Sequence, residues 1–153
     1  MITVKKLAAA AAMLLVLSIV AAGCTEKQES SYEFEGESAS WKAVYRIDVV
    51  TLITTENGKN KYDTKETAEF VLTYNKDISL LENTKHLAYS FTNGQTGGSE
   101  EISFESPPSE GTFIHKSVSS SDEWTNFDFE NGSVDAEVVL DGVAEHIKLL
   151  PKH

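Results

Sequence analysis

Cysteine is almost absent from this sequence, which has a single one at position 24. A lone cysteine excludes a disulfide within the chain and leaves no thiolate pair for a metal or redox site. Basic residues are also scarce, with 13 Lys and Arg against 24 Asp and Glu and a formal net charge of −11. Such a chain repels phosphates, and this excludes nucleic acid as a partner.

Long apolar runs are missing except at the N-terminus. Lys5 and Lys6 precede an apolar stretch over residues 7–22, and the small residues 21–23 lead to Cys24. A basic start, an apolar middle and small residues before a cut are typical of a secretory signal. The stretch is shorter than the roughly 20 residues that a membrane span needs, and polar residues follow it at once.

The residues around the cysteine carry a resemblance to a known class of proteins. The segment Val20-Ala21-Ala22-Gly23-Cys24 resembles the lipobox of bacterial lipoproteins, with Ala21 at the position where leucine is commonest. The resemblance implies cleavage between Gly23 and Cys24, a diacylglyceryl group on the Cys24 thiol, and a location on the outer side of the cell membrane. Two acyl chains give durable attachment, whereas one holds weakly.

The expected division of the chain follows from this resemblance. Residues 1–23 form the signal peptide, residues 24–37 the lipidated cysteine and a polar tether, and residues 38–153 one domain. Removing Lys5 and Lys6 from the 13 basic residues leaves 11 against 24 acidic ones, for a formal charge of −13. This charge favours solubility and permits cationic partners, among them metal ions, basic peptides and cationic wall polymers.

The folded domain is expected to be built from strands. Trp41, Ala43, Tyr45 and Ile47 alternate with polar residues, which is typical of a half-buried strand. Similar alternation recurs at residues 65–74, 87–91, 102–104, 134–140 and 143–149, whereas residues 93–99 and 117–121 are expected to be loops. Asn-Gly at 57–58 and Asp-Gly at 141–142 predict tight hairpins. The pattern predicts an all-β domain, a single antiparallel β-sandwich of about seven or eight strands, immunoglobulin-like or open-barrel-like.

A second resemblance involves both ends of this domain. The segment Gly36-Glu37-Ser38-Ala39-Ser40-Trp41 resembles a motif near the start of small uncharacterised lipoproteins from Gram-positive spore-formers. The closing hairpin, with Glu145, Ile147 and Leu149, resembles them too. The resemblance supports the lipoprotein and β-domain predictions and adds no catalytic residue.

Candidate metal ligands are sparse. His86, His115, His146 and His153 have no local ligand spacing, although strands could bring the first three together. Asn126, Asp128 and Glu130 place oxygens at i, i+2 and i+4, as in a calcium loop. The glycine of that segment comes one position late, and Phe127 and Phe129 also fit a strand with one apolar face.

The remaining candidates concern binding. Trp41 is in register with the apolar face of its strand and is expected in the core, whereas Trp124 lies in a polar stretch and is a candidate surface aromatic. No Gly-x-Ser-x-Gly turn or phosphate-binding glycine loop is present, and no catalytic residue or cofactor is assigned. The leading hypothesis is a non-enzymatic, membrane-anchored binding or envelope protein. A divalent-metal-binding domain and a small envelope hydrolase using carboxylates are the alternatives.

Overall fold

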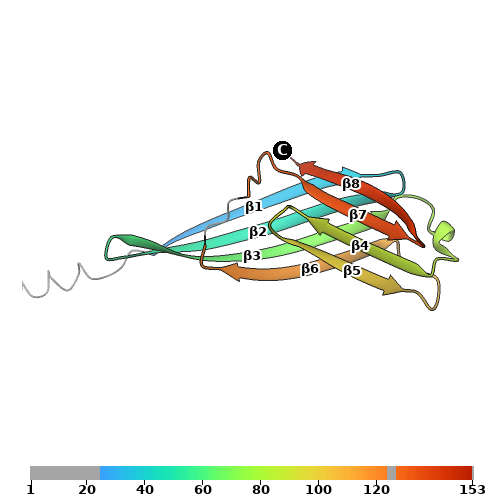
Figure 1. Ribbon diagram of the computed structural model, residues 1–153, viewed down its shortest axis with the longest axis horizontal. Coiled ribbons are helices and arrows are strands. Elements are labelled where there is room, and N and C mark those ends of the chain that lie inside the picture. The colour runs from blue at the N-terminus through green and yellow to red at the C-terminus, as the bar shows by residue number, and fades with distance from the viewer. Residues whose placement is uncertain (1–24, 124–126, 153) are drawn as a thin grey trace, which may run out of the picture.

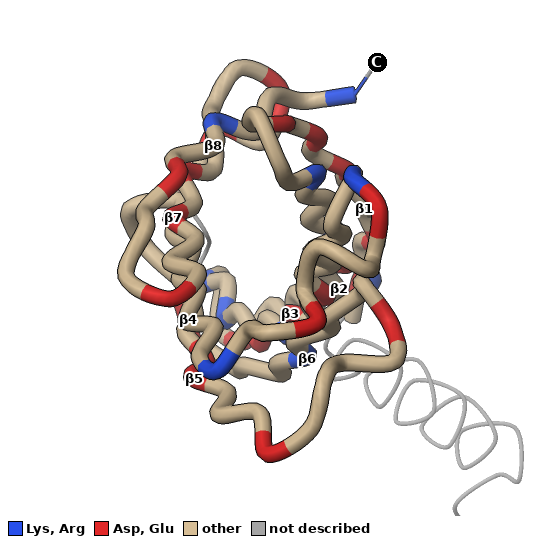
Figure 2. The backbone as a smooth tube through the Cα atoms, turned by 90° about the vertical axis from the view of Figure 1, so that its right-hand side faces the viewer, with Lys and Arg blue, Asp and Glu red and all other residues tan. Residues whose placement is uncertain are grey.

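The computed structural model describes residues 25–123 and 127–152. Within them, eight antiparallel strands form one sheet in the order β5-β4-β7-β8-β1-β2-β3-β6. The sheet curls until its two edge strands approach each other, so the fold is a nearly closed barrel (Figures 1 and 2). The all-β prediction is confirmed, in its open-barrel form. The strands are β1 (Thr25–Glu37), β2 (Trp41–Glu56), β3 (Lys59–Tyr74), β4 (His86–Thr92), β5 (Gly97–Ser103), β6 (Thr112–Ser121), β7 (Val134–Leu140) and β8 (Val143–Pro151).

The core lies inside the barrel and is supplied by alternate residues of the strands. The aromatic side chains are in contact there, since Phe70 stacks on Phe91 with ring centroids 4.3 Å apart. Trp41 is buried with its ring edge toward Tyr74, as its register predicts. The main inward-facing residues are Phe34, Trp41, Ala43, Tyr45, Ile47, Phe70, Leu72, Leu87, Tyr89, Phe91, Val134, Val138, Ile147 and Leu149.

Both predicted hairpins are confirmed. Asn57 and Gly58 have φ values of 52° and 73°, and Asp141 and Gly142 have 48° and 86°. Two successive positive φ values define the turn whose twist matches that of the flanking strands. The short segment before β4, residues Ile78–Leu81, is a 3₁₀ helix.

The segment expected as a tether is a strand. β1 pairs with β2 from Thr25 opposite Thr54 to Glu37 opposite Lys42. Its first seven residues are exposed, so they show no apolar alternation, and composition alone suggested a tether. The folded sheet therefore includes residues 25–37, which were expected to form a tether.

Two expected loops are also shorter than predicted. Residues 117–121 belong to β6, where they pair with β3 from Ala68 to Thr64. Only residues 93–96 form the β4–β5 turn, because β5 begins at Gly97. The serine run and the two glycines conceal these strand ends, since neither has an apolar side chain to show the period.

The two segments that carry the second resemblance meet in space. Ser38 Oγ and the Ser40 backbone N–H donate to Glu145 Oε2 at 2.6 and 3.0 Å. Burial raises the pKa of Glu145, but these bonds outweigh it and hold the pKa below its usual value. The β1–β2 turn is thereby fixed to β8, at the end of a junction where β1 and β8 pair only through Phe34–Pro151 and Glu35–Leu150.

Three strands continue past the barrel. Residues 25–31 of β1, 50–56 of β2 and 59–65 of β3, here named the ribbon, extend to the β2–β3 turn (Figure 1, left). Thr51 Oγ1 and Thr64 Oγ1 are 3.1 Å apart and buried at its base. β6 ends opposite Thr64, so the outer part of the ribbon has three strands.

Acid is expected to weaken the link between the β7–β8 turn and β4. Asp141 Oδ1 accepts from the backbone N–H groups of Lys85 and His86 at 2.9 and 2.8 Å, which lowers the pKa of Asp141. A lowered folded-state pKa adds stability above the unfolded value of about 3.9, and this stability is lost as pH falls through the folded pKa. Asp141→Asn should therefore unfold at a lower urea concentration than the wild type at pH 7, and the difference between the two urea midpoints should be smaller at pH 3. An equal difference in midpoint at both pH values would contradict this prediction.

Candidate functional site

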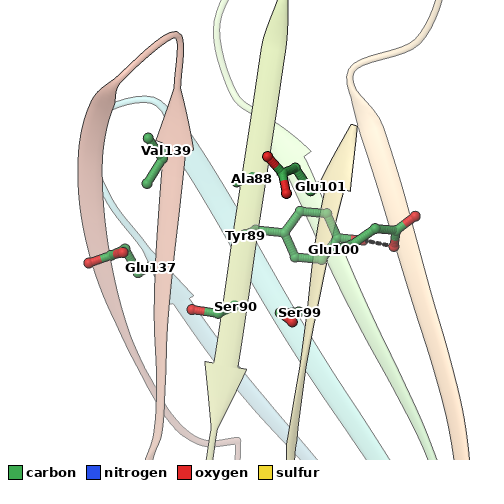
Figure 3. Close-up of a pocket in the computed structure, with 8 residues that line it drawn as sticks. All are labelled: Ala88, Tyr89, Ser90, Ser99, Glu100, Glu101, Glu137 and Val139. Carbon is green, nitrogen blue, oxygen red and sulfur yellow. Dashed lines mark hydrogen bonds between the residues drawn. The ribbon is translucent and has the colours of Figure 1, made fainter. Parts of the chain in front are cut away.

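A shallow hollow of about 390 Å³ lies on the outer side of β4, β5 and β7 (Figure 3). Its floor is formed by the small side chains of Ala88, Ser90 and Ser99. The β4–β5 register places Ser90 opposite Ser99 and Ala88 opposite Glu101. Glu137 faces Ser90 from β7. Alternation on each strand directs these residues outward, while the longer side chains of Glu101 and Glu137 stand around the floor. We name this surface the acidic hollow.

One side of the acidic hollow reaches the edge of the sheet. The Tyr89 hydroxyl donates to Glu100 Oε2 at 2.6 Å, as Figure 3 shows. Burial, and then the hydrogen bond to this carboxylate, raise the pKa of Tyr89. Tyr89 is therefore a neutral donor that holds Glu100 in place.

The same glutamate lies at the seam between edge strands β5 and β6. His115 Nδ1 of β6 is 3.6 Å from Glu100 Oε2, and the His115 ring meets Phe91 edge-on with centroids 5.5 Å apart. A Cβ on Gly98 would lie 2.8 Å from His115 Nε2, so glycine allows the ring to enter the seam. Side chains, rather than a backbone ladder, therefore bring the two edges together.

The structure does not bring the histidines together. His86 Nε2 lies 2.8 Å from Glu101 Oε1, and His146 Nδ1 lies 3.5 Å from Glu137 Oε2. Each of these three histidines, His86, His115 and His146, therefore lies beside a different glutamate. Over residues 25–123 and 127–152, no group of three or more His, Cys, Asp or Glu residues is arranged to hold a metal ion. His153 lies outside the described residues.

The calcium-like segment forms a tight turn. Asp128 Oδ1 accepts from the backbone N–H groups of Glu130 and Asn131 at 3.1 and 3.0 Å, and the Asn131 amide binds both carboxylate oxygens. These bonds lower the pKa of Asp128, the side-chain one from Asn131 first. The alternative of a strand is wrong, but its apolar residues do face inward, since Phe129 stacks on Tyr32. The spacing therefore serves the turn; Asn126 lies outside the described residues.

The other outer face has its charges paired. A row that starts just after β8 and crosses β1, β2, β3 and β6 places Glu33 between Lys152 and Arg46, at 2.9 and 2.6 Å. Glu69 lies between Arg46 and Lys116, at 3.5 and 2.9 Å. The hydrogen bond from Lys152, then that from Arg46, lowers the pKa of Glu33. By contrast, no Lys or Arg of the described segments pairs with a glutamate of the acidic hollow.

Several sequence candidates lie outside what the structure describes. Gly23, Cys24 and Trp124 are among them, so the cleavage site, the lipidation site and the candidate surface aromatic keep their status as predictions. No helix in the described parts of the chain is long and apolar enough to cross a membrane.

The acidic hollow was not found from the sequence. Alternation along β7 does place Glu137 outward, but the small residues beside it come from other strands and depend on register. The two outer carboxylates give the surface a capacity to bind cationic groups. The chain matches no protein-family model, no curated protein sequence and no solved structure.

Proposed function

We propose that this chain is a lipid-anchored lipoprotein of the extracytoplasmic face, whose barrel is a binding domain of the cell envelope. The observation that carries the proposal is the pairing of the residue next to Cys24. Thr25 already lies in the sheet, opposite Thr54 of β2. Cleavage before Cys24 would therefore leave every described strand intact, which suits a chain that loses its first 23 residues and keeps the rest.

The binding role is supported by the charge distribution. The glutamates of the acidic hollow have histidine or tyrosine neighbours, whereas the opposite face pairs its acids with lysine and arginine. A cationic group of an envelope partner would therefore find carboxylates that are not neutralised by a lysine or arginine of the described segments. Asp128 is engaged by its own turn, and no observation favours the metal-binding or hydrolase alternatives.

Replacing Cys24 by Ser tests the anchor. The wild-type protein, expressed in a Gram-positive host, should sediment with membranes, incorporate labelled fatty acid and give a lipidated N-terminal peptide at Cys24. Cys24→Ser should lose the fatty-acid label entirely, because the chain has no other thiol. Thr25→Ser is the matched control and should be lipidated normally. Mass spectrometry showing residue 24 unmodified, or residues 1–23 still attached, would refute the proposal.

A further inference from the structure

The ribbon bears on how the barrel is positioned relative to the membrane. The following inference rests on the proposed lipid anchor at Cys24. We propose that the ribbon is a rigid stalk that stands on the bilayer, with the β2–β3 turn among the lipid headgroups. In this arrangement the outer end of the ribbon contacts the lipid surface. Three observations support this: the pairing of Thr25, the continuity of the strands and the distribution of charge.

Because Thr25 is already paired in the sheet, no flexible linker separates the lipidated residue from the folded domain. Cys24 is one peptide unit, about 3.8 Å, from Thr25. Thr25 is opposite Thr54, and only Thr55 and Glu56 separate that level from the turn. At about 3.4 Å per residue, the turn reaches some 10 Å beyond Thr25. The start of β1 and the β2–β3 turn lie at the same end of the molecule (Figure 1), so a lipid on Cys24 would be held at that end.

The strands of the ribbon run into the barrel without a break. β2 and β3 pair continuously from Glu56–Lys59 to Trp41–Tyr74, and β1 pairs with β2 throughout. Three paired strands resist bending far better than a single chain. Val49, the core residue nearest the anchor, is opposite Ser30, five residues beyond Thr25, so the core begins about 20 Å from the anchor.

Charge is divided between the two parts. The ribbon has four basic and four acidic residues, and so all of the net negative charge belongs to the rest of the protein. A neutral ribbon can approach an anionic bilayer, and a barrel core that begins about 20 Å away lies more than two Debye lengths of about 8 Å from it. The charged residues are Lys27, Lys59, Lys61, Lys65, Glu26, Glu29, Glu56 and Asp63.

Only Lys59 combines a position next to the turn with the absence of an ion pair among the described residues. Lys61 pairs with Glu56, and Lys27 pairs with Glu29. Lys59 and Lys65 are exposed and form no ion pair with another described residue. Lys59 directly follows the turn, at the position closest to the headgroups.

A single introduced thiol reports the position of the turn. The lipidated protein has no other free cysteine, so Asn57→Cys and Ser109→Cys each accept one fluorophore. Ser109 is exposed in the loop before β6, at the end of the barrel away from the ribbon. In vesicles of phosphatidylcholine and phosphatidylglycerol with a headgroup nitroxide, the label at 57 should lose most of its fluorescence. The label at 109 should lose none.

Two further variants separate the stalk from the anchor. A flexible Gly-Ser insertion of about 15 residues between Cys24 and Thr25 has a mean span near 20 Å and should abolish quenching at 57 without releasing the protein. Lys59→Glu should reduce quenching at 57, whereas Lys42→Glu, at the far end of β2, should not. Loss of vesicle binding in all samples defeats the proposed anchor. Bound protein with equal quenching at 57 and 109 defeats the stalk alone.

Discussion

Phe70→Ala should lower the free energy of unfolding by about 3–5 kcal/mol, the usual cost of truncating a fully buried aromatic residue. Phe70 is 0% exposed in the middle of β3. Its ring stacks on Phe91 at 4.3 Å and lies 5.7 Å from Tyr89, so it joins the β3 wall of the barrel to the β4 wall. With both neighbours on a different strand, the cavity left by alanine cannot be filled by a local adjustment.

Urea denaturation measures this effect against a control on the same strand. Val71 is the next residue and faces outward, where it is only half-buried. Val71→Ala should cost less than about 1 kcal/mol, as surface substitutions do. The midpoint of Phe70→Ala should fall strongly at an unchanged m-value, since a domain has only about 5–15 kcal/mol in total. Equal losses in the two variants would mean that the barrel interior is not the core.

The strands that are best predicted from the sequence are those with one solvent-exposed face and one buried face. β2, β7 and β8 alternate because each has one face inside the barrel, and the Asn-Gly and Asp-Gly turns mark their ends. The ribbon half of β1 and the serine half of β6 lie beyond the core, with both faces polar or exposed. Their order comes from backbone pairing with distant strands, for which periodicity holds no signal.

The candidate site shows the same division. The local spacing of Asp128 and Glu130 is visible in the sequence, but its cause is a turn that uses the Asp128 carboxylate itself. The acidic hollow is a product of register, since Ser90 acquires Ser99 on one side and Glu137 on the other. Surfaces assembled from three strands cannot be read from any one of them.

The close approach of β1 to β8 explains why position 36 is a glycine. An ideal Cβ there would lie 2.5 Å from the Lys148 carbonyl oxygen and 2.9 Å from Ile147 Cγ2. The carbonyl belongs to the β8 backbone, which cannot rotate away as a side chain would. Gly36 thus allows β1 to approach β8 at a junction that has only two paired positions.

Gly36→Val should therefore open this junction and destabilise the protein by about 1–3 kcal/mol, as overpacking of a tight contact does. The effect should be local as well as global. The Lys152 backbone N–H donates to the Glu33 carbonyl at 2.8 Å, just beyond the paired positions, and its hydrogen exchange should become faster. Exchange at β2–β3 pairs far from the junction, such as Val44–Val71, should change only as much as global stability does.

Ser30→Val provides the matched control, because it adds the same β-branched side chain to an exposed position of the same strand. It should leave both the urea midpoint and the Lys152 exchange rate near the wild-type values. Gly36→Ala should fall between the control and Gly36→Val, since the first added carbon already meets the β8 backbone. If Gly36→Val matched Ser30→Val, β1 and β8 would have to be farther apart than the pairing requires. The barrel would then be held closed by the Ser38–Glu145 contact rather than by the strand junction.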